Sequence, residues 1–294
     1  MHNYLKSDSH NQFNKNNNKA YNNANNINVN NFKTKIIVVS NQKGGVGKTT
    51  TVSSLATSLS LLNKTCLLID LDPQGNLSTI MGIDYEARKN NIYNVLCSSI
   101  TIQNAILSTA NKNVDIITAN MDLIAFNTEN INNFQKEYIL KNILIKFLNL
   151  QKFKCYDYIL IDCSPALNLL SVNALTCADY VIIPMQAEYL SLEGLVQLMH
   201  TIKLIQDNYN KELDLLGILI TMFDKRSNLA KLVIKEVQEF LKDSVFKSII
   251  PRTVKISEAQ SYSQTILNYD SSSIAAIEYL NFAKEIINRI NSSN

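Results

Sequence analysis

A glycine-rich segment with two lysines carries the most specific chemistry in the sequence: Lys43-Gly44-Gly45-Val46-Gly47-Lys48-Thr49-Thr50. Glycines let the backbone turn its N–H groups toward an anion, and the N-terminus of a following helix adds partial positive charge. Lys48 can reach the β- and γ-phosphates of a nucleotide, and the Thr49 hydroxyl can ligate Mg²⁺. The whole segment is therefore predicted to bind ATP and Mg²⁺, with Lys48 also catalytic.

The usual phosphate-loop pattern, Gly-x-x-x-x-Gly-Lys-Ser/Thr, is met only in part. Gln42 stands where the pattern has its first glycine, and Lys43 adds a second lysine before the glycine pair. Because Gly-Lys-Thr alone occurs by chance, the second lysine makes the segment more specific than the common pattern. A glycine turn without a ligand is the alternative, but the strand expected before it and the helix expected after it favour a phosphate loop.

Two acidic segments, residues 67–76 and 158–165, come at the ends of apolar runs. ATP hydrolysis needs a bound Mg²⁺ and a water held in line with the leaving group. We expect Asp162 to belong to the Mg²⁺ shell, together with Thr49 and Asp72, and Asp72 to position the attacking water. Asp70 either supports these groups or contacts the metal, and the sequence does not separate the two roles. An aspartate that only caps the next helix would give the same local pattern.

Short apolar runs alternate with helical patterns along the chain. Strands are expected at 36–40, 65–70, 114–119, 158–162, 180–184, 215–221 and 245–250, and helices at 49–62, 133–148, 191–206, 228–241 and 272–290. This alternation predicts an α/β fold, a mostly parallel twisted sheet with helices on both faces and right-handed crossovers. Ligands in such sheets bind beyond the carboxyl ends of the strands, where the motifs above fall.

Composition divides the chain in two. Residues 1–32 are rich in asparagine and poor in apolar side chains, so ordering them would cost entropy with little burial in return. They are predicted to be a disordered tail, with no role or with a weak basic contact to DNA or a partner. Residues 33–294 are expected to form a single P-loop ATPase domain.

The overall composition excludes some functions and leaves others open. The net charge of +3 does not by itself indicate a nucleic-acid-binding protein. The five cysteines form no Cys-x-x-Cys pair, which favours small buried side chains in a reducing cytosol over a metal site. No apolar run reaches the ~20 residues of a membrane helix, and no secretory signal is recognised. A cytoplasmic location is therefore expected.

Several of these segments together resemble the ParA/MinD ATPases. Residues 43–50 resemble the family's deviant Walker A motif, 70–76 its switch I segment and 162–165 its Walker B region, although ParA proteins commonly carry a second proline where Ser164 stands. Further similar segments are 184–188, 192–195, 219–224, 250–255 and 258–259. The resemblance extends from about Lys35 to Asn288 and is greatest to the chromosomal, Soj-like ParA partition proteins. Residues 261–264 depart from the glycine-containing stretch usual there.

The resemblance implies a function in the segregation of a chromosome or a plasmid. ATP would drive a sandwich homodimer in which Lys43 reaches the partner's phosphates as a catalytic residue, with Met222 and Pro251 beside the nucleotide. The dimer would bind double-stranded DNA non-specifically, and so associate with the nucleoid, through Arg226, Arg252 and Lys255. A ParB-like centromere-binding protein would stimulate the slow hydrolysis of ATP to ADP and phosphate.

Three other functions compete with this one. A MinD-like positioning ATPase at a membrane needs a C-terminal amphipathic helix with a basic face, whereas residues 285–294 are short and end in asparagine and serine. An electron-transfer ATPase of the nitrogenase iron-protein kind needs cysteines from two subunits around one cluster, for which the sequence gives no supporting context. A non-enzymatic DNA-coating protein or repressor is the third, but the tail is too short and polar for a helix-turn-helix domain.

Overall fold

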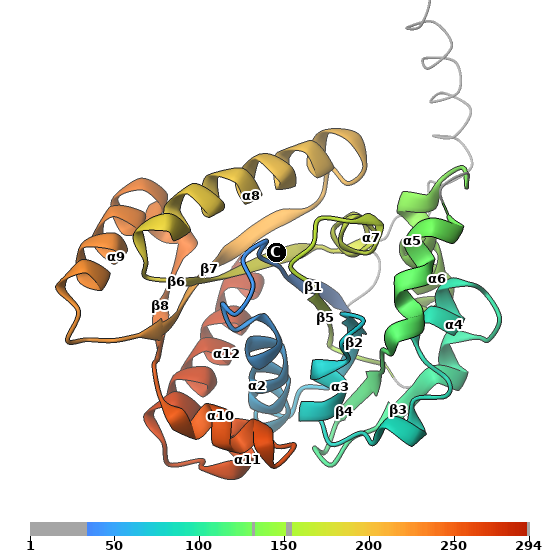
Figure 1. The fold of residues 1–294 in the computed structure, drawn as a ribbon, viewed down its shortest axis with the longest axis horizontal. Helices are drawn as coiled ribbons and strands as arrows, with labels where there is room; N and C mark the ends of the chain where they lie inside the picture. The colour runs from blue at the N-terminus through green and yellow to red at the C-terminus, as the bar shows by residue number, and fades with distance from the viewer. Residues whose placement is uncertain (1–33, 131–132, 151–154, 293–294) are drawn as a thin grey trace, which may run out of the picture. The chain divides into compact units, whose positions relative to one another are not determined.

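The computed structural model describes residues 34–130, 133–150 and 155–292 (Figure 1). The tail predicted at residues 1–32 lies outside this part of the chain. An eight-stranded sheet has the order β3-β4-β2-β5-β1-β6-β7-β8, and all neighbours are parallel except β3 and β4. The strands are β1 Lys35–Val39, β2 Cys66–Leu71, β3 Ile106–Ser108, β4 Val114–Ile117, β5 Tyr158–Cys163, β6 Tyr180–Gln186, β7 Asp214–Phe223 and β8 Val245–Pro251.

Helices cover both faces of the sheet. The α-helices are α2 Lys48–Leu61, α3 Asn76–Ile80, α4 Ile92–Leu96, α5 Ala125–Glu129, α6 Ile139–Leu148, α7 Leu169–Cys177, α8 Tyr189–Asn208, α9 Asn228–Leu241, α10 Val254–Ser261, α11 Ile266–Tyr269 and α12 Ile274–Ser292. Short 3₁₀ turns are η2 Tyr85–Ala87, η3 Ile102–Ala105, η4 Met121–Ile124, η5 Lys136–Tyr138 and η6 Lys242–Ser244. In Figure 1, α2 and α12 lie below the central strands and α7 and α8 above them. The α/β fold predicted from the sequence is therefore confirmed.

One apolar core lies between each face of the sheet and the helices that cover it, and the strands contribute side chains to both cores. Ile36 and Val38 of β1 pack into the core with α4, α6, α7, α8 and α9, whereas Ile37 and Val39 pack into the core with α2, α11 and α12. Successive side chains of a strand point to opposite faces. The same alternation places Asp70 of β2 and its register partner Asp162 of β5 on the α2 face. Both carboxylates therefore lie on the side of the sheet where the phosphate loop ends.

The differences from the sequence prediction have local causes. Strand β3 is a three-residue antiparallel edge, too short to give a period. Helix α7 is buried on nearly all sides and so has no amphipathic stripe by which to detect it. The helix expected from residue 133 begins at Ile139 after a 3₁₀ turn, and the helix expected from Ser191 begins earlier, at Tyr189.

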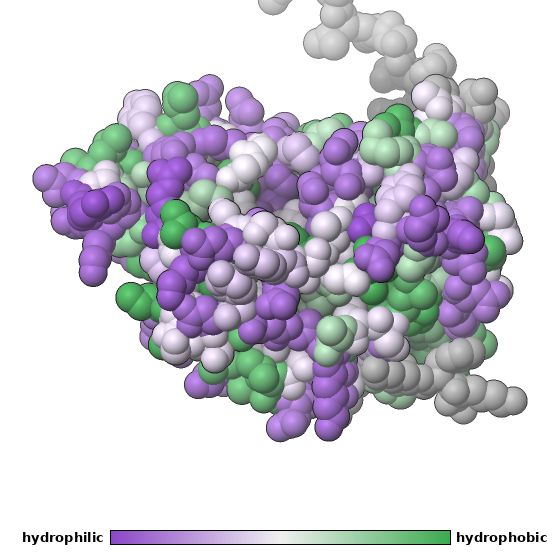
Figure 2. Space-filling view, turned by 60° about the horizontal axis from the view of Figure 1, so that its bottom comes forward, coloured by the Kyte–Doolittle hydropathy of each residue, from purple (hydrophilic) through white to green (hydrophobic). Residues whose placement is uncertain are grey.

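Apolar residues are not gathered into one broad patch on the face shown in Figure 2, where hydrophobic residues (green) are scattered among hydrophilic ones (purple). Across the described ranges, no helix has both the length and the apolar character needed to span a bilayer.

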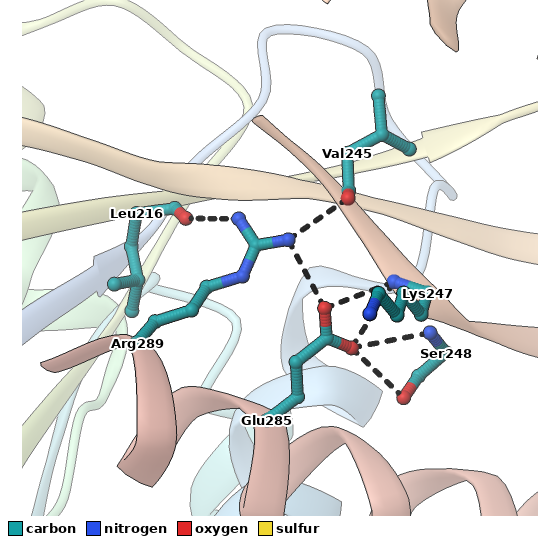
Figure 3. Close-up of polar contacts among 6 residues, drawn as sticks. All are labelled: Leu216, Val245, Lys247, Ser248, Glu285 and Arg289. Carbon is teal, nitrogen blue, oxygen red and sulfur yellow. Dashed lines mark hydrogen bonds and ion pairs between the residues drawn. The ribbon is translucent and has the colours of Figure 1, made fainter. Parts of the chain in front are cut away.

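One ion pair joins helix α12 to the last two strands of the sheet, β7 and β8 (Figure 3). The Glu285 carboxylate accepts hydrogen bonds from the backbone N–H groups of Lys247 and Ser248 at 3.0–3.2 Å and from Arg289 at 3.0 Å. Arg289 also donates to the carbonyls of Leu216 and Val245. Leu216 lies on β7 and Val245 on β8, and the register of these two strands shifts further along. The ion pair therefore joins α12 to both strands beside an irregular part of the sheet and satisfies backbone groups there.

We expect Glu285→Ala to lower the free energy of unfolding by about 1–3 kcal/mol, because it takes the carboxylate acceptor from the half-buried Arg289 guanidinium and from two strand N–H groups. Urea unfolding followed by circular dichroism measures the loss. The control is Glu239→Ala on α9, where the glutamate is 67% exposed in its pair with Lys235 and a change within about 0.5 kcal/mol is expected. Equal losses in the two variants would show that Glu285 does not stabilise the contact of α12 with β7 and β8.

Candidate phosphate-binding site

The loop from Ser40 to Gly47 joins β1 to α2 and forms a cradle of backbone N–H groups. Gly45 and Gly47 have φ values of +71° and +88°, a region that favours glycine. Nothing lies within 4 Å of a Cβ built on Gly44 or Gly45, so the loop backbone is open to a ligand there. Helix α2 begins at Lys48, directly after this turn, and its free N–H groups face the same space.

Three side chains hold the loop against the ends of β6 and β7. Asn41 donates to the Pro184 carbonyl at 2.8 Å, Gln186 to the Gly45 carbonyl at 2.8 Å and Thr221 to the Val46 carbonyl at 2.8 Å. The last two bonds occupy loop carbonyls and leave the N–H groups for a ligand. The loop is thus fixed before any anion arrives, which reduces the entropy cost of binding.

A cleft of about 920 Å³ opens over this loop and contains most of the predicted nucleotide-binding residues. Gly44, Gly45, Gly47, Lys48, Thr49, Thr50, Asp72 and Met222 line it. Val46 is buried beneath the loop, and Asp162 lies fully buried at the end of β5. The cleft also contains residues that the sequence did not single out, namely Asn76, Thr79, Asn127, Asn168 and Gln260.

Lys48, which lines the cleft, and the buried Asp162 lie near enough for each to favour the charged form of the other. Burial lowers the pKa of the Lys48 ammonium, and the nearby Asp162, Cys163 and Asp72 oppose that shift. Burial raises the pKa of the Asp162 carboxyl well above its usual range, and Asp70 adds to the rise. Lys48 donates to the Lys43 carbonyl at 3.0 Å, so its ammonium is held at the loop.

The surroundings of Asp162 fit a magnesium ion. Neither carboxylate oxygen has a hydrogen-bond partner of good geometry in the described part of the chain, although the Thr49 hydroxyl and Lys48 favour its charged form. A buried carboxylate in this position is costly unless a cation compensates it. No cluster of three or more His, Cys, Asp or Glu within the described ranges could hold a metal. Mg²⁺ would therefore need phosphate oxygens and water as further ligands, as is usual for this ion.

The oxygens of Asp70 are already occupied. They accept hydrogen bonds from the Ser78 hydroxyl at 2.7 Å, the Ser78 N–H at 2.9 Å and the Asp72 N–H at 3.2 Å. Burial raises the pKa of the Asp70 carboxyl to about 6, and these donors oppose the rise. Of the two roles left open for Asp70, this geometry favours support of the Asp72 turn over metal contact.

The buried Arg88 side chain also stabilises the turn that carries Asp72. The sequence alone did not indicate this role. Its guanidinium donates to the Gly75 carbonyl at 3.1 Å, the Thr79 hydroxyl at 2.8 Å and the Ile83 carbonyl at 2.7 Å. Gly75 is needed here because a Cβ would meet the Arg88 Nη1 at 2.6 Å. The turn that carries Asp72 is thus fixed from below, and no local pattern marks Arg88 for this task.

Lys43 does not line the cleft. Its ammonium lies 2.6 Å from Glu188, the residue before α8, and the two side chains are 39% and 53% exposed. The side chain of this second loop lysine therefore points away from the phosphate cradle.

The remaining predicted residues meet in a second cleft of about 640 Å³. Arg226, Arg252 and Lys255 line it together with Lys225, and Pro251 lies here rather than among the residues that line the phosphate cleft. The Arg226 guanidinium donates two hydrogen bonds to Asp224, and Lys255 pairs with Asp270. The structure thus brings the three predicted DNA-binding residues together, and acidic partners partly neutralise two of them, Arg226 and Lys255.

Comparison with known proteins agrees with this geometry. Residues 34–215 match a family model described as an AAA domain. The sporulation initiation inhibitor protein Soj of Bacillus subtilis is 42% identical over 252 residues, 86% of this chain and 98% of that protein. Two crystal structures are also similar. A putative plasmid partition protein from Borrelia burgdorferi bound to AMPPNP has a TM-score of 0.72 and 29% identity, covering 89% of this chain and 100% of that one.

The second structure is a cobyrinic acid a,c-diamide synthase from Mycobacterium smegmatis with bound ADP and magnesium. It has a TM-score of 0.77 and 32% identity, and covers 89% of this chain and 97% of that one. The identity to Soj and the near-complete coverage decide the family. The chain belongs to the ParA/MinD family of P-loop ATPases, and Soj-like chromosome partition proteins are among its relatives.

Proposed function

We propose that this protein is a DNA-partition ATPase that segregates a chromosome or a plasmid. The observation that carries the proposal is the buried Asp162 carboxylate, without a good hydrogen-bond partner among the described residues, beside Lys48 and an open glycine cradle. A cation and a polyphosphate together satisfy all three features. The relatives named Soj and ParA support the partition role, and the MinD-like alternative has less support.

The residues divide the chemistry of hydrolysis among them. The loop N–H groups and Lys48 hold the phosphates and stabilise charge that develops on them. Thr49, Asp162 and Asp72 are the groups that would hold Mg²⁺, which neutralises phosphate charge when bound. Asp72 stands on a turn fixed by Asp70 and Arg88, where its carboxylate can hold a water for attack.

Lys43 supplies the second part of the proposal. Two nucleotides that face each other across a dimer repel, and cations from both subunits reduce that repulsion, as an arginine finger does in trans. The exposed Lys43–Glu188 pair stabilises the monomer by about 0–1 kcal/mol at most, so the lysine can leave it at little cost. ATP would therefore bring two copies together with Lys43 on the partner's phosphates.

The second cleft, here called the basic cleft, is the proposed DNA-binding surface. Lys225, Arg226, Arg252 and Lys255 gather there on the ends of β7 and β8 and the start of α10. Arginine and lysine side chains bind DNA phosphates, and such contacts carry no sequence information. A cluster of cations alone therefore fits binding to DNA without sequence preference. Association with the nucleoid and release on hydrolysis, stimulated by a ParB-like partner, complete the proposal.

Lys48→Ala should reduce MgATP affinity by on the order of 100-fold, because it removes the charge-assisted hydrogen bonds to the phosphates. Calorimetric titration with MgATP measures the effect, and the control is Lys64→Ala, a half-buried lysine that pairs with Asp157 and does not line the cleft. Tight binding by Lys48→Ala would contradict the assignment of the cleft.

Asp72→Ala should bind MgATP, hydrolyse it at least about 100-fold more slowly and accumulate as a dimer, because the attacking water is no longer held.

Lys43→Ala should bind MgATP and stay monomeric. Size-exclusion chromatography with ATP, ADP and no nucleotide separates these states. Normal turnover by Asp72→Ala, or a dimer formed by Lys43→Ala, would refute the corresponding role.

Arg226→Glu combined with Lys255→Glu should weaken DNA binding of the ATP-bound dimer. It should also flatten the dependence of log K on log salt by about one unit for each DNA phosphate that the variant no longer neutralises. Fluorescence anisotropy on a random duplex at several salt concentrations gives both values, while dimerisation should not change. The exposed pair Lys203→Glu with Lys235→Glu, on α8 and α9, is the matched control. An unchanged slope would place the DNA elsewhere.

A further inference from the structure

A side chain from the far end of the sequence reaches into the phosphate cleft. Gln260 lies near the end of α10, and its Nε2 donates a 2.8 Å hydrogen bond to the Thr50 hydroxyl, 210 positions earlier in the chain. Both side chains are half-buried, and both line the cleft. The phosphate loop is thus completed by a residue from outside its own motif.

The hydroxyl chemistry gives this contact a direction. A threonine hydroxyl has one proton to donate and two lone pairs with which to accept. The Gln260 amide occupies a lone pair of Thr50, and no described residue accepts the Thr50 proton. The carbonyl of Val46, four residues back, where a helical threonine commonly donates, accepts from Thr221 and not from Thr50. The Thr50 proton therefore remains for a group in the cleft.

Gln260 is held firmly enough to impose this orientation. The neighbouring Ala259 is fully buried, and the backbone after it turns back on the helix through N–H bonds from Tyr262 and Gln264. At its start, α10 is capped by the Thr253 side chain, which accepts from the Lys255 N–H. The amide is thus delivered by a short helix fixed at both ends rather than by a loose loop.

We propose that Gln260 is a positioning residue for nucleotide binding: it fixes the Thr50 hydroxyl so that its proton is donated to a phosphate oxygen of the bound nucleotide. This inference rests on the proposed function, because it needs a phosphate ligand in the cleft. It assigns to α10, which also carries Lys255 of the basic cleft, a contact with the phosphate loop.

A double-mutant cycle on the full chain tests the proposal. MgATP and MgADP affinities are measured by calorimetry for the wild type, Gln260→Ala, Thr50→Val and the double variant. Gln260→Ala should weaken affinity about three- to ten-fold when Thr50 is present, the range of one neutral hydrogen bond. In the Thr50→Val background it should have no effect, because no hydroxyl is left to orient. Gln264→Ala, an exposed glutamine just beyond α10, is the matched control and should bind as the wild type does.

Gln260→Glu tests the direction of the hydrogen bond without the cycle. A carboxylate accepts the Thr50 proton instead of donating to its oxygen, and it adds negative charge to the cleft. It should therefore weaken affinity more than Gln260→Ala does, while thermal unfolding of the ligand-free variants stays close to the wild type.

The outcomes separate this inference from the function it rests on. Equal losses for Gln260→Ala in the wild-type and Thr50→Val backgrounds, or Gln260→Glu binding as tightly as the wild type, would overturn the positioning role and leave the ATPase proposal intact. A wild-type protein that binds neither nucleotide would overturn both.

Discussion

The structure depends on the burial of one carboxylate at the end of a central strand. Asp162 is fully enclosed between β1 and β2, and its burial disfavours the charged form unless a cation is near. Lys48, itself buried, compensates only in part, since its own charge is also disfavoured by burial. The protein thus holds an unbalanced polar centre under an open cradle of N–H groups. Magnesium and a polyphosphate, taken together, balance that centre better than either does alone.

Rigid surroundings give this centre its selectivity. The loop is bound to β6 and β7 through Asn41, Gln186 and Thr221, and the Asp72 turn is bound from below by Asp70 and Arg88. Donors fixed before the ligand arrives lose little entropy on binding and need no reorganisation during reaction. Parallel strands that all end at one edge make this possible, because residues far apart in sequence are delivered to one place by the sheet itself.

Sequence patterns were enough to predict the sheet, its two helical layers and the phosphate loop, because apolar periodicity and glycine spacing are local signals. They also indicated Asp72 and Asp162, since each follows a buried run. The contacts of Arg88, Glu188 and Gln260 were not predictable in the same way. Glu188 and Gln260 have partners 145 and 210 positions away. Those of Arg88 lie in or beside α3, a five-residue helix too short to show a period. Pro251 shows the opposite limit. Its motif predicted a place beside the nucleotide, but the residue lines the basic cleft.

The acidic partners of the basic cleft explain why DNA binding would depend on nucleotide. Asp224 and Asp270 each pair with a cation there, so in the proposed complex a DNA phosphate would compete with a carboxylate for Arg226 or Lys255. These exposed pairs are weak, yet they remove part of the gain from each phosphate contact. A single patch of this kind binds weakly. Two patches joined in one dimer convert the second contact into an intramolecular one, which can raise the overall affinity by orders of magnitude without any new residue. In the proposed dimer, association at the phosphate cleft would act on DNA through avidity, and the basic cleft itself would not need to change.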